Sequence, residues 1–195
     1  MKSYSIPGFT NNKELDIIYE WAKTVPENGV IVEIGSLFGR TAVAFAEGAH
    51  PSVKVYAIDY FNGTWDNLYA DSNTYPLGFW EKGKLYNKGE EFNKFTSEYK
   101  NIIPLTLDNS QEVYQYNLEP IDVLFIDAAH TNPSDLDNIL YFKKFLKKNS
   151  LICGHDYNKL MYPDIVQNVK LLEETYNTTA LYYKGSSLWA LRIKE

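Results

Sequence analysis

The sequence predicts an α/β fold: an open, doubly wound sheet of seven strands, mostly parallel, whose last strand runs antiparallel to its neighbour. Two observations predict it. Short, β-rich apolar runs alternate with amphipathic stretches along most of the chain, and the last part holds two β-rich runs around a KGSS turn, as in a hairpin. A length of 195 residues suits one domain with a substantial core, so we expect residues 1–195 to form a single domain.

The first part of the chain supplies two helix–strand pairs. Residues 12–24 carry apolar side chains at helical spacing, and an ENG sequence separates them from VIVEIG at 30–35, which reads as a buried strand. A second helix is expected over 39–49, with Gly48 near its end, and a second strand over 53–59.

The second part continues the alternation. The run at 101–108 contains the third strand, with Pro104 near its start, where a missing N–H is tolerable. The run IDVLFID at 121–127 is nearly all apolar, as expected of a strand buried on both faces in a parallel sheet. The other expected elements are a short helix at 110–117, a helix at 134–147, a strand at 150–156, a helix at 164–176 and the hairpin at 178–193.

The segment 61–91 interrupts this alternation. It is rich in glycine, tyrosine and tryptophan, and it has no sustained periodicity. A long irregular segment in a compact domain is usually functional or disordered, and the aromatic residues argue against disorder. We expect an aromatic-rich insertion that acts as a lid or substrate loop, with an oligomer contact as the alternative.

Charge and cysteine usage narrow the class of protein. A formal net charge of −6 disfavours general nucleic-acid binding. No apolar run approaches the roughly 20 residues of a membrane helix, and no signal peptide is evident, so we expect a soluble, cytoplasmic protein without a membrane partner. The single cysteine, Cys153, lies in an apolar run and is expected in the core of a protein from a reducing compartment. The high aromatic content is compatible with a homodimer.

Acidic residues stand at the ends of five expected strands. In open α/β sheets, ligands bind beyond the carboxyl ends of the strands, so these acids should meet at one edge. Each acid alone has the alternative role of capping the following helix, an explanation that weakens when all five are taken together. The five are Glu33, Asp59, Asp108, Asp127 and Asp156.

The stretch EIGSLFGR indicates which ligand the first strand end takes. Gly35 allows a tight turn after the strand, and Gly39 allows close approach at the helix start. The dinucleotide fingerprint requires a glycine where this chain has Leu37, so a nicotinamide cofactor is disfavoured. Glu33 would repel a diphosphate and favour a cationic ligand carrying a sulfonium or an amino group.

Two further strand ends are candidates for the rest of a nucleoside. Asp59 suits a ribose diol, which donates two hydroxyl hydrogens to one carboxylate, although this would equally fit NAD. The side chains of Asp108, Asn109 and Ser110 could recognise an adenine amino group, and Asp108 could instead cap the helix expected at Ser110.

The sequences FIDAAH and GHD end two strands that are expected to be neighbours. Asp127 and His130 follow the first, and His155 and Asp156 follow the second. Carboxylates and an imidazole that converge from adjacent strands make a divalent-metal site, for which oxygen ligands favour Mg²⁺. His130 would then suit a general base, with a hydrogen-bonded structural histidine as the alternative. The third histidine, His50, is expected on the surface at a helix end.

At these residues the chain resembles the class I S-adenosylmethionine-dependent methyltransferases, from about Val30 to Ile193. VEIGSLFGR is similar to the first motif of that family, VYAID to its second, and the final hairpin to its reversed seventh strand. FID-x-x-H and the later GHD resemble the metal-dependent O-methyltransferases of the catechol, macrolide-sugar and cephalosporin types.

The resemblance implies a Rossmann-like methyltransferase fold and a set of site residues. It implies a metal site at Asp127, His155 and Asp156, and catalytic roles for Asp127 and for His130 as the base. His155 stands where an acid is commoner, and Ala128-Ala129 replaces a more usual glycine. The residues expected to bind S-adenosylmethionine are Glu33, Gly35, Ser36, Gly39, Arg40, Thr41, Asp59, Tyr60, Asp108, Asn109, Ser110 and Asp127.

The leading hypothesis is therefore an S-adenosylmethionine-dependent methyltransferase that methylates a hydroxyl of a small molecule or sugar with the help of Mg²⁺ or another divalent ion. A metal-independent methyltransferase, in which His130 acts alone, is the first alternative. A non-catalytic protein that binds S-adenosylmethionine or a nucleotide is the second, and a NAD(P)-binding oxidoreductase is the third.

Overall fold

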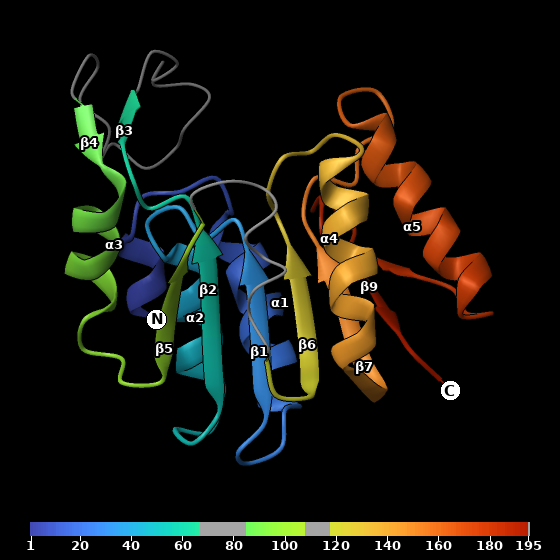
Figure 1. Ribbon diagram of the computed structural model, residues 1–195, viewed down its shortest axis with the longest axis horizontal. Helices are drawn as coiled ribbons and strands as arrows, with labels where there is room; N and C mark the ends of the chain where they lie inside the picture. The colour runs from blue at the N-terminus through green and yellow to red at the C-terminus, as the bar shows by residue number, and fades with distance from the viewer. Residues whose placement is uncertain (67–84, 108–117, 195) are drawn as a thin grey trace.

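A computed structural model describes residues 1–66, 85–107 and 118–194, and its main feature is a seven-stranded sheet (Figure 1). The strands lie in the order β5-β2-β1-β6-β7-β9-β8, and the first five of these are parallel. β9 runs antiparallel to both of its neighbours, as the KGSS turn predicts. Their bounds are β1 Val30–Ile34, β2 Lys54–Asp59, β5 Ile102–Thr106, β6 Ile121–Ile126, β7 Leu146–Gly154, β8 Leu181–Tyr182 and β9 Trp189–Arg192.

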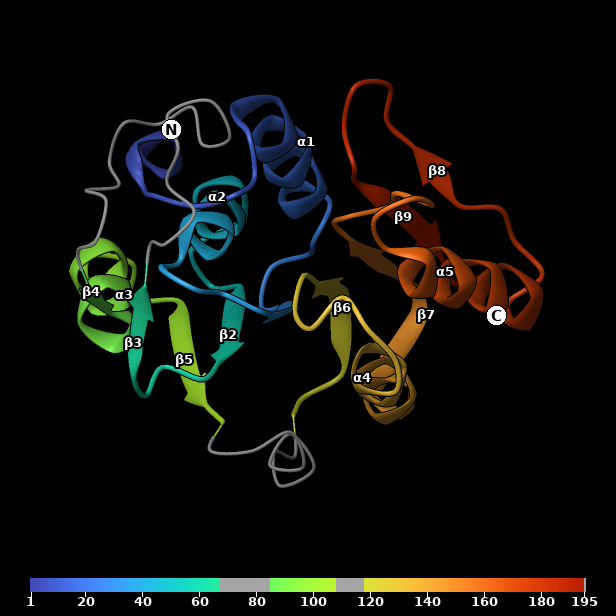
Figure 2. The same ribbon diagram turned by 90° about the horizontal axis from the view of Figure 1, so that it is seen from above.

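Helices cover both faces of this sheet, which confirms the doubly wound arrangement. Figure 2 shows α1 (Asn12–Lys23) and α2 (Arg40–Gly48) on one face, together with the short 3₁₀ helix η1 (Lys2–Ser5). The opposite face carries α4 (Ser134–Phe142) and α5 (Pro163–Thr175). α1 begins with a capping box, in which the Asn11 side chain accepts from the Glu14 N–H and the Glu14 side chain accepts from the Asn11 N–H.

The buried strands divide their side chains between two apolar cores. Along β6, Val123 and Phe125 pack in the core under α1 and α2, whereas Leu124 and Ile126 pack in the core under α4 and α5. This alternation follows from the two-residue period of a strand and explains why residues 123–126 are all apolar. Cys153 is fully buried in the first core, as expected.

The carboxyl ends of four central strands finish level with one another. Ile34 pairs with Ile58 on one side and with Ile126 on the other, and Ile126 pairs with Gly154. The residues that follow these positions therefore emerge at the same edge of the sheet, which is the arrangement predicted from the strand-end acids. Within the described residues, no helix has the length and apolar character needed to cross a membrane.

The segment expected to be an irregular insertion contains regular structure at both of its ends. A two-stranded antiparallel sheet joins β3 (Thr64–Asp66) to β4 (Leu85–Asn87), and α3 (Lys88–Thr96) follows directly. The expectation of no regular structure is wrong here because three-residue strands are too short to show a period. Residues 67–84, and with them most of the expected lid, lie outside the described residues.

A second difference concerns the boundary between α4 and β7. A single helix was expected over 134–147, but α4 ends at Phe142, a 3₁₀ turn spans Lys143–Phe145, and β7 begins at Leu146. The strand is irregular at its start, since the register shifts opposite Ile121 to Val123 and Asn149 has a φ of 67°. This irregularity breaks the alternation that would have identified a strand from the sequence.

Pro104 lies within β5 rather than at the start of the strand. β5 is an edge strand, where a residue without an N–H is tolerated. The expected helix at 110–117 lies outside the described residues.

Candidate functional site

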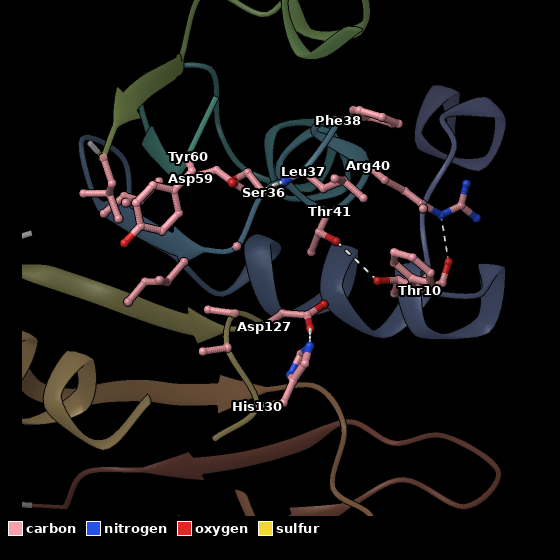
Figure 3. Close-up of a pocket in the computed structure, with 18 of the residues that line it drawn as sticks. Thr10, Ser36, Leu37, Phe38, Arg40, Thr41, Asp59, Tyr60, Asp127 and His130 are labelled. Atoms are coloured by element: carbon pink, nitrogen blue, oxygen red, sulfur yellow. Dashed lines mark hydrogen bonds and ion pairs between the residues drawn. The ribbon is translucent and has the colours of Figure 1, made fainter. Parts of the chain in front are cut away.

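A cavity of about 330 Å³ opens at the carboxyl ends of β1, β2 and β6. Most of its lining comes from four chain segments (Figure 3): the N-terminal stretch 7–10, the turn between β1 and α2, the end of β2, and the residues after β6. Leu107 after β5 and two residues of α4, Ser134 and Asn138, complete it. The volume falls within the range of small-molecule and cofactor sites. Among the predicted donor-binding residues, those that line it are Gly35, Ser36, Arg40, Thr41, Asp59, Tyr60 and Asp127.

The turn between β1 and α2 requires its glycines. Gly35 has a φ of 93°, and a Cβ there would lie 1.7 Å from the carbonyl oxygen of Asp127. Gly39, with a φ of 84°, is the N-cap of α2. Leu37 also takes a left-handed conformation, with a φ of 47°, and its N–H donates to Oδ2 of Asp59 at 2.7 Å. The turn is therefore tied both to the end of β2 and to the end of β6.

Glu33 lies beneath this turn, fully buried, instead of projecting into the cavity as expected. Ser36 Oγ donates to its Oε2 at 2.5 Å, and Oε1 has no hydrogen-bond partner among the described residues. Burial raises the pKa of Glu33 to about 8; the Ser36 hydrogen bond opposes this shift, while Asp127 and Asp59 add to it. A buried carboxyl with an unpartnered oxygen fits a cationic ligand close by, because a positive charge would favour its ionised form.

Arg40 has a different position from the one expected of a donor-binding residue. Its guanidinium turns away from the cavity and donates to the N-terminal segment, including the carbonyl oxygen of Thr10 at 2.7 Å (Figure 3). The side chain is buried, and burial lowers the pKa of Arg40 to about 10. Its contact with the cavity therefore comes from the non-polar part of the side chain.

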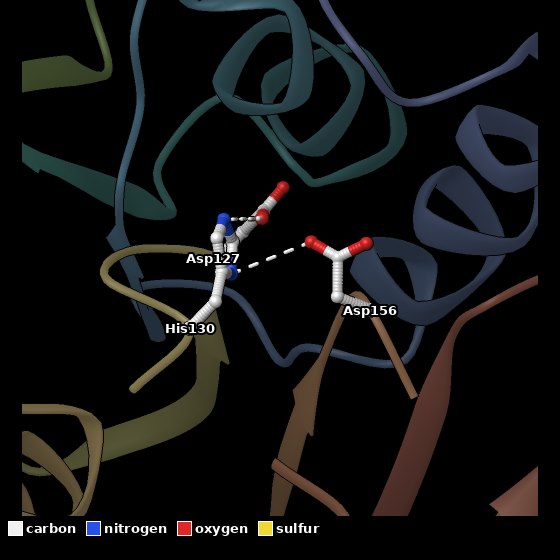
Figure 4. Close-up of side chains that lie close together, drawn as sticks. All are labelled: Asp127, His130 and Asp156. Carbon is white, nitrogen blue, oxygen red and sulfur yellow. Dashed lines mark ion pairs between the residues drawn. The ribbon is translucent and has the colours of Figure 1, made fainter. Parts of the chain in front are cut away.

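Three side chains gather next to the cavity and form what we call the acid–histidine cluster: Asp127, His130 and Asp156 (Figure 4). One nitrogen or oxygen atom from each lies within 4.8 Å of the others. His130 Nε2 is 4.0 Å from Asp127 Oδ1, and His130 Nδ1 is 3.4 Å from Asp156 Oδ2. His130 and Asp156 both have a φ of 59°, a strained conformation that is typical of functional sites.

His155 was predicted as a metal ligand, but the structure places His130, and not His155, in this cluster. The His155 ring is buried, with Nε2 at 2.9 Å from Ser187 Oγ and at 3.2 Å from Glu14 Oε2. Its Nδ1 lies 3.2 Å from Oδ1 of Asp156, the oxygen on the far side from His130. His155 thus contacts a cluster residue from behind.

The electrostatics of this region show an excess of acid. Burial raises the pKa of Asp127; the histidines lower it, and the carboxylates of Asp156 and Asp135 raise it further. Burial on its own would lower the pKa of His155, but Asp127, Asp156 and Glu14 outweigh it, so that pKa lies well above its usual value. Two carboxylates beside one imidazole suit a divalent cation with oxygen-rich ligation.

The loop that carries His130 is held by residues that the sequence analysis did not single out. The buried Asp135 accepts from the Ala129 N–H at 3.1 Å. Asn132 and Asn168 exchange two side-chain hydrogen bonds of 3.1 and 2.9 Å. Asp135 could have been found as an acid in the first turn of a helix, but Asn168 lies on a distant helix and gave no signal.

The N-terminal stretch 7–10 is a second part of the site that the sequence did not indicate. Phe9 and Thr10 line the cavity, and Thr10 Oγ1 lies 3.4 Å from Thr41 Oγ1 (Figure 3). Asp108, Asn109 and Ser110, predicted to recognise adenine, lie outside the described residues.

Solved structures with this fold span almost the whole chain. The O-methyltransferase NovP has a TM-score of 0.69 at 16% identity and covers 95% of this chain and 81% of its own. A putative caffeoyl-CoA O-methyltransferase from Staphylococcus aureus has a TM-score of 0.67 at 14% identity, with coverages of 97% and 86%. An O-methyltransferase from Bacillus cereus, solved in complex with SAH, has a TM-score of 0.61 at 17% identity, with coverages of 97% and 84%.

Sequence comparison gives the family. No curated protein sequence matches the chain. Residues 32–157 match the model of a methyltransferase domain family, a range that begins within the strand before the glycine turn and ends just after the GHD sequence. The matched range therefore includes the glycine turn and the acid–histidine cluster, and the chain belongs to this family of methyltransferase domains.

Proposed function

We propose that this methyltransferase transfers the methyl group of S-adenosylmethionine to a hydroxyl of a small molecule or sugar, with a divalent cation, best Mg²⁺, bound beside the donor. The observation that carries the proposal is the acid–histidine cluster next to the cavity of a methyltransferase domain. The cavity volume of about 330 Å³ is of the size expected of a cofactor site.

The donor would occupy the cavity between the glycine turn and the end of β2. Asp59 would accept from the ribose hydroxyls, since the Leu37 N–H holds its carboxylate at the cavity wall. Glu33, buried beneath the turn, would stabilise the positive charge of the donor from below. The Bacillus cereus O-methyltransferase was solved in complex with SAH, the product of such a donor, so this fold holds that product in that protein.

The cation would be held by Asp127 and Asp156, whose carboxylates face the cluster from neighbouring strands. When bound, it would lower the pKa of the acceptor hydroxyl and orient the oxygen toward the methyl group. His155 would keep Asp156 in place, because its Nδ1 contacts Oδ1 and leaves Oδ2 directed toward the cluster.

His130 would take the proton of the acceptor hydroxyl. The acceptor oxygen forms a bond to the methyl carbon as the carbon–sulfur bond breaks, the electron pair stays on sulfur, and the proton passes to an imidazole nitrogen of His130. His130 lines the cavity, so its ring can reach an acceptor there. Its ring also lies against Tyr162, with 5.1 Å between the ring centres, which restricts its orientation.

A second assignment has a specific observation in its favour. Both ring nitrogens of His130 face a carboxylate of the cluster, so His130 could be a third ligand of the cation instead of the base. Substitution His130→Ala separates the two roles. As a base, His130 would be needed for turnover but not for Mg²⁺ affinity; as a ligand, its loss would weaken Mg²⁺ binding as well.

The experiment that tests the proposal is a methyl-transfer screen over catechols, sugars and phenolic acids, with added Mg²⁺ and with EDTA. Transfer from S-adenosylmethionine that falls on chelation and returns with Mg²⁺ is the expected result. Transfer that is unchanged by EDTA would establish the metal-independent alternative. Calorimetric titration with NAD and S-adenosylmethionine complements the screen, since binding of NAD alone would reject the proposed donor.

A further inference from the structure

We propose that Arg40 is a positioning residue for the methyl donor, acting through an N-terminal strap formed by residues 3–10. This inference rests on the proposed function and deepens it. Arg40 would not touch the donor; it would fix the strap as one wall of the cavity. The strap and the start of α2, which carries Arg40, lie side by side in Figure 3.

The hydrogen bonds of the guanidinium all lead to the strap and its continuation. Nε donates to the Thr10 carbonyl oxygen at 2.7 Å. Nη1 donates to the carbonyl oxygens of Ser3 at 3.0 Å and Tyr4 at 3.1 Å, and also to that of Ile6. Nη2 donates to Oδ1 of Asn12 at 2.8 Å. All three nitrogens are therefore engaged, and every acceptor is a neutral oxygen.

This arrangement makes Arg40 and the strap depend on each other. A buried guanidinium is costly unless its donors are hydrogen-bonded, and the side chain of Arg40 is almost completely buried. The Ser3 carbonyl also accepts from the Ile6 N–H, but the carbonyls of Tyr4, Ile6 and Thr10 have no backbone donor among the described residues, so Arg40 supplies the donors that they need. Loss of the guanidinium would leave buried carbonyls without donors and would release the strap.

The strap reaches the cavity at its C-terminal part. Pro7, Gly8, Phe9 and Thr10 line the cavity, and Thr10 also approaches Thr41 at the start of α2. Gly8 lies directly on the Arg40 side chain, since a Cβ at Gly8 would be 2.7 Å from Arg40 Cδ. The position of this wall is therefore set by the methylene groups of Arg40 as well as by its guanidinium.

The test compares Arg40→Met with Gly8→Val, whose added side chain would press against Arg40 and displace the strap from it, in single and double variants of the full chain. The matched control is Arg192→Met, because Arg192 donates to Asn149 and Thr24 at the opposite edge of the sheet. The measurements are the dissociation constant of S-adenosylhomocysteine by calorimetry, hydrogen exchange of residues 3–12, and the melting temperature.

We expect each single variant to weaken S-adenosylhomocysteine binding by about tenfold and to raise hydrogen exchange in the strap, while Arg192→Met changes neither. The double variant should bind S-adenosylhomocysteine with the same affinity as the single variant that has the larger loss, because both substitutions act through the same wall. Hydrogen exchange in β1 and β6 should remain slow, which shows that the variants are folded.

Two results would overturn the inference without affecting the proposed function. One is an unchanged affinity in Arg40→Met despite faster exchange in the strap. The other is a double variant whose losses multiply, since Arg40 would then act independently of the strap. If the wild-type chain bound no S-adenosylhomocysteine at all, the proposed function would fail and this inference with it.

Discussion

The two sides of the cavity are built on different principles. On the donor side, around β1 and β2, polar groups are held by fixed hydrogen bonds: Asp59 to the Leu37 N–H, Glu33 to Ser36, and Arg40 to the strap. On the side of β6 and β7, the acid–histidine cluster consists of charged groups that mainly face one another. The comparison indicates that the donor side is preformed, whereas the cluster side needs an added positive charge to be balanced.

The substitution with the largest expected effect is Asp127→Asn, which tests whether the cluster side is needed for turnover. Asp127 is the cluster residue closest to the glycine turn, and the substitution removes a negative charge at the proposed cation site without changing the size of the side chain. We expect the turnover number to fall by about a thousandfold, measured by methyl transfer at saturating donor. Asp137→Asn, at an exposed position of α4, is the matched control. Near-normal turnover in Asp127→Asn would show that the cluster is not catalytic.

Glu33→Gln probes the donor side through its pH dependence. An ordinary glutamate loses its proton near pH 4.5 in the unfolded chain, but Glu33 keeps it in the folded chain until about pH 8. Unfolding therefore releases a proton between these values, so the stability of the donor-free protein should decrease as pH rises from about 4.5 to 8. We expect Glu33→Gln to remove a decrease of about 4 kcal/mol, measured by urea unfolding at several pH values.

The control for this measurement is Glu174→Gln, at an exposed position of α5. It should keep the pH dependence of the wild-type chain. An identical slope in Glu33→Gln would contradict the buried, protonated state of Glu33.

Addition of Mg²⁺ tests whether the cluster side binds a cation that balances its charge. A cation that binds only the folded chain should stabilise it by about 2.7 kcal/mol at a concentration one hundred times its dissociation constant, which raises the melting temperature by roughly 5–11 °C. We expect EDTA to reverse the shift and Asp156→Asn to abolish it, while Asp137→Asn keeps it. A shift that survives in Asp156→Asn would place the cation elsewhere.

The smallest expected effect concerns the N-terminal cap of α1, which contacts His155 behind the acid–histidine cluster. Glu14 belongs to the capping box of α1 and also faces His155 behind the cluster. Asn11→Ala should cost about 1 kcal/mol of unfolding free energy, and so should Asn87→Ala at the equivalent position of α3. Only Asn11→Ala should also weaken Mg²⁺ binding, by a few-fold, as measured by calorimetry. Equal Mg²⁺ affinities in the two variants would show that the cap of α1 does not influence cation binding at the cluster.

The pattern of strands could be predicted from the sequence because it depends on local periodicity and on residues at strand ends. Glu33, Asp59, Asp127 and Asp156 do meet at one edge, and the family match confirms the prediction of a methyltransferase. His50 is exposed, as expected for a residue at a helix end.

The roles of Arg40 and His155 could not be predicted because their partners are remote in the sequence. Arg40 stands in the first motif, where a side chain is expected to reach the donor, yet it contacts residues near the N-terminus. His155 stands next to a cluster residue, but its ring is directed by Glu14 and Ser187. In both cases the sequence identified a residue of the right type near the site, but it did not show in which direction the side chain points.

Asn149 shows a similar limit for the fold. A single left-handed residue near the start of β7 disrupts the alternation of side chains, so a helix seemed to extend into what is a strand. Local irregularities of this kind leave no periodic signal to detect.

The contact between Gly35 and the carbonyl group of Asp127 has a consequence for how the protein acquires its activity. The two residues belong to strands that are far apart in the sequence and neighbours in the sheet. Contacts of this kind form slowly during folding, because a long stretch of chain must be closed before they are made. A partly folded chain, with only its N-terminal helices and strands in place, would have a donor wall but no opposing cluster. Methyl transfer should therefore recover only with the pairing of β1 and β6, and its return during refolding would report on that step.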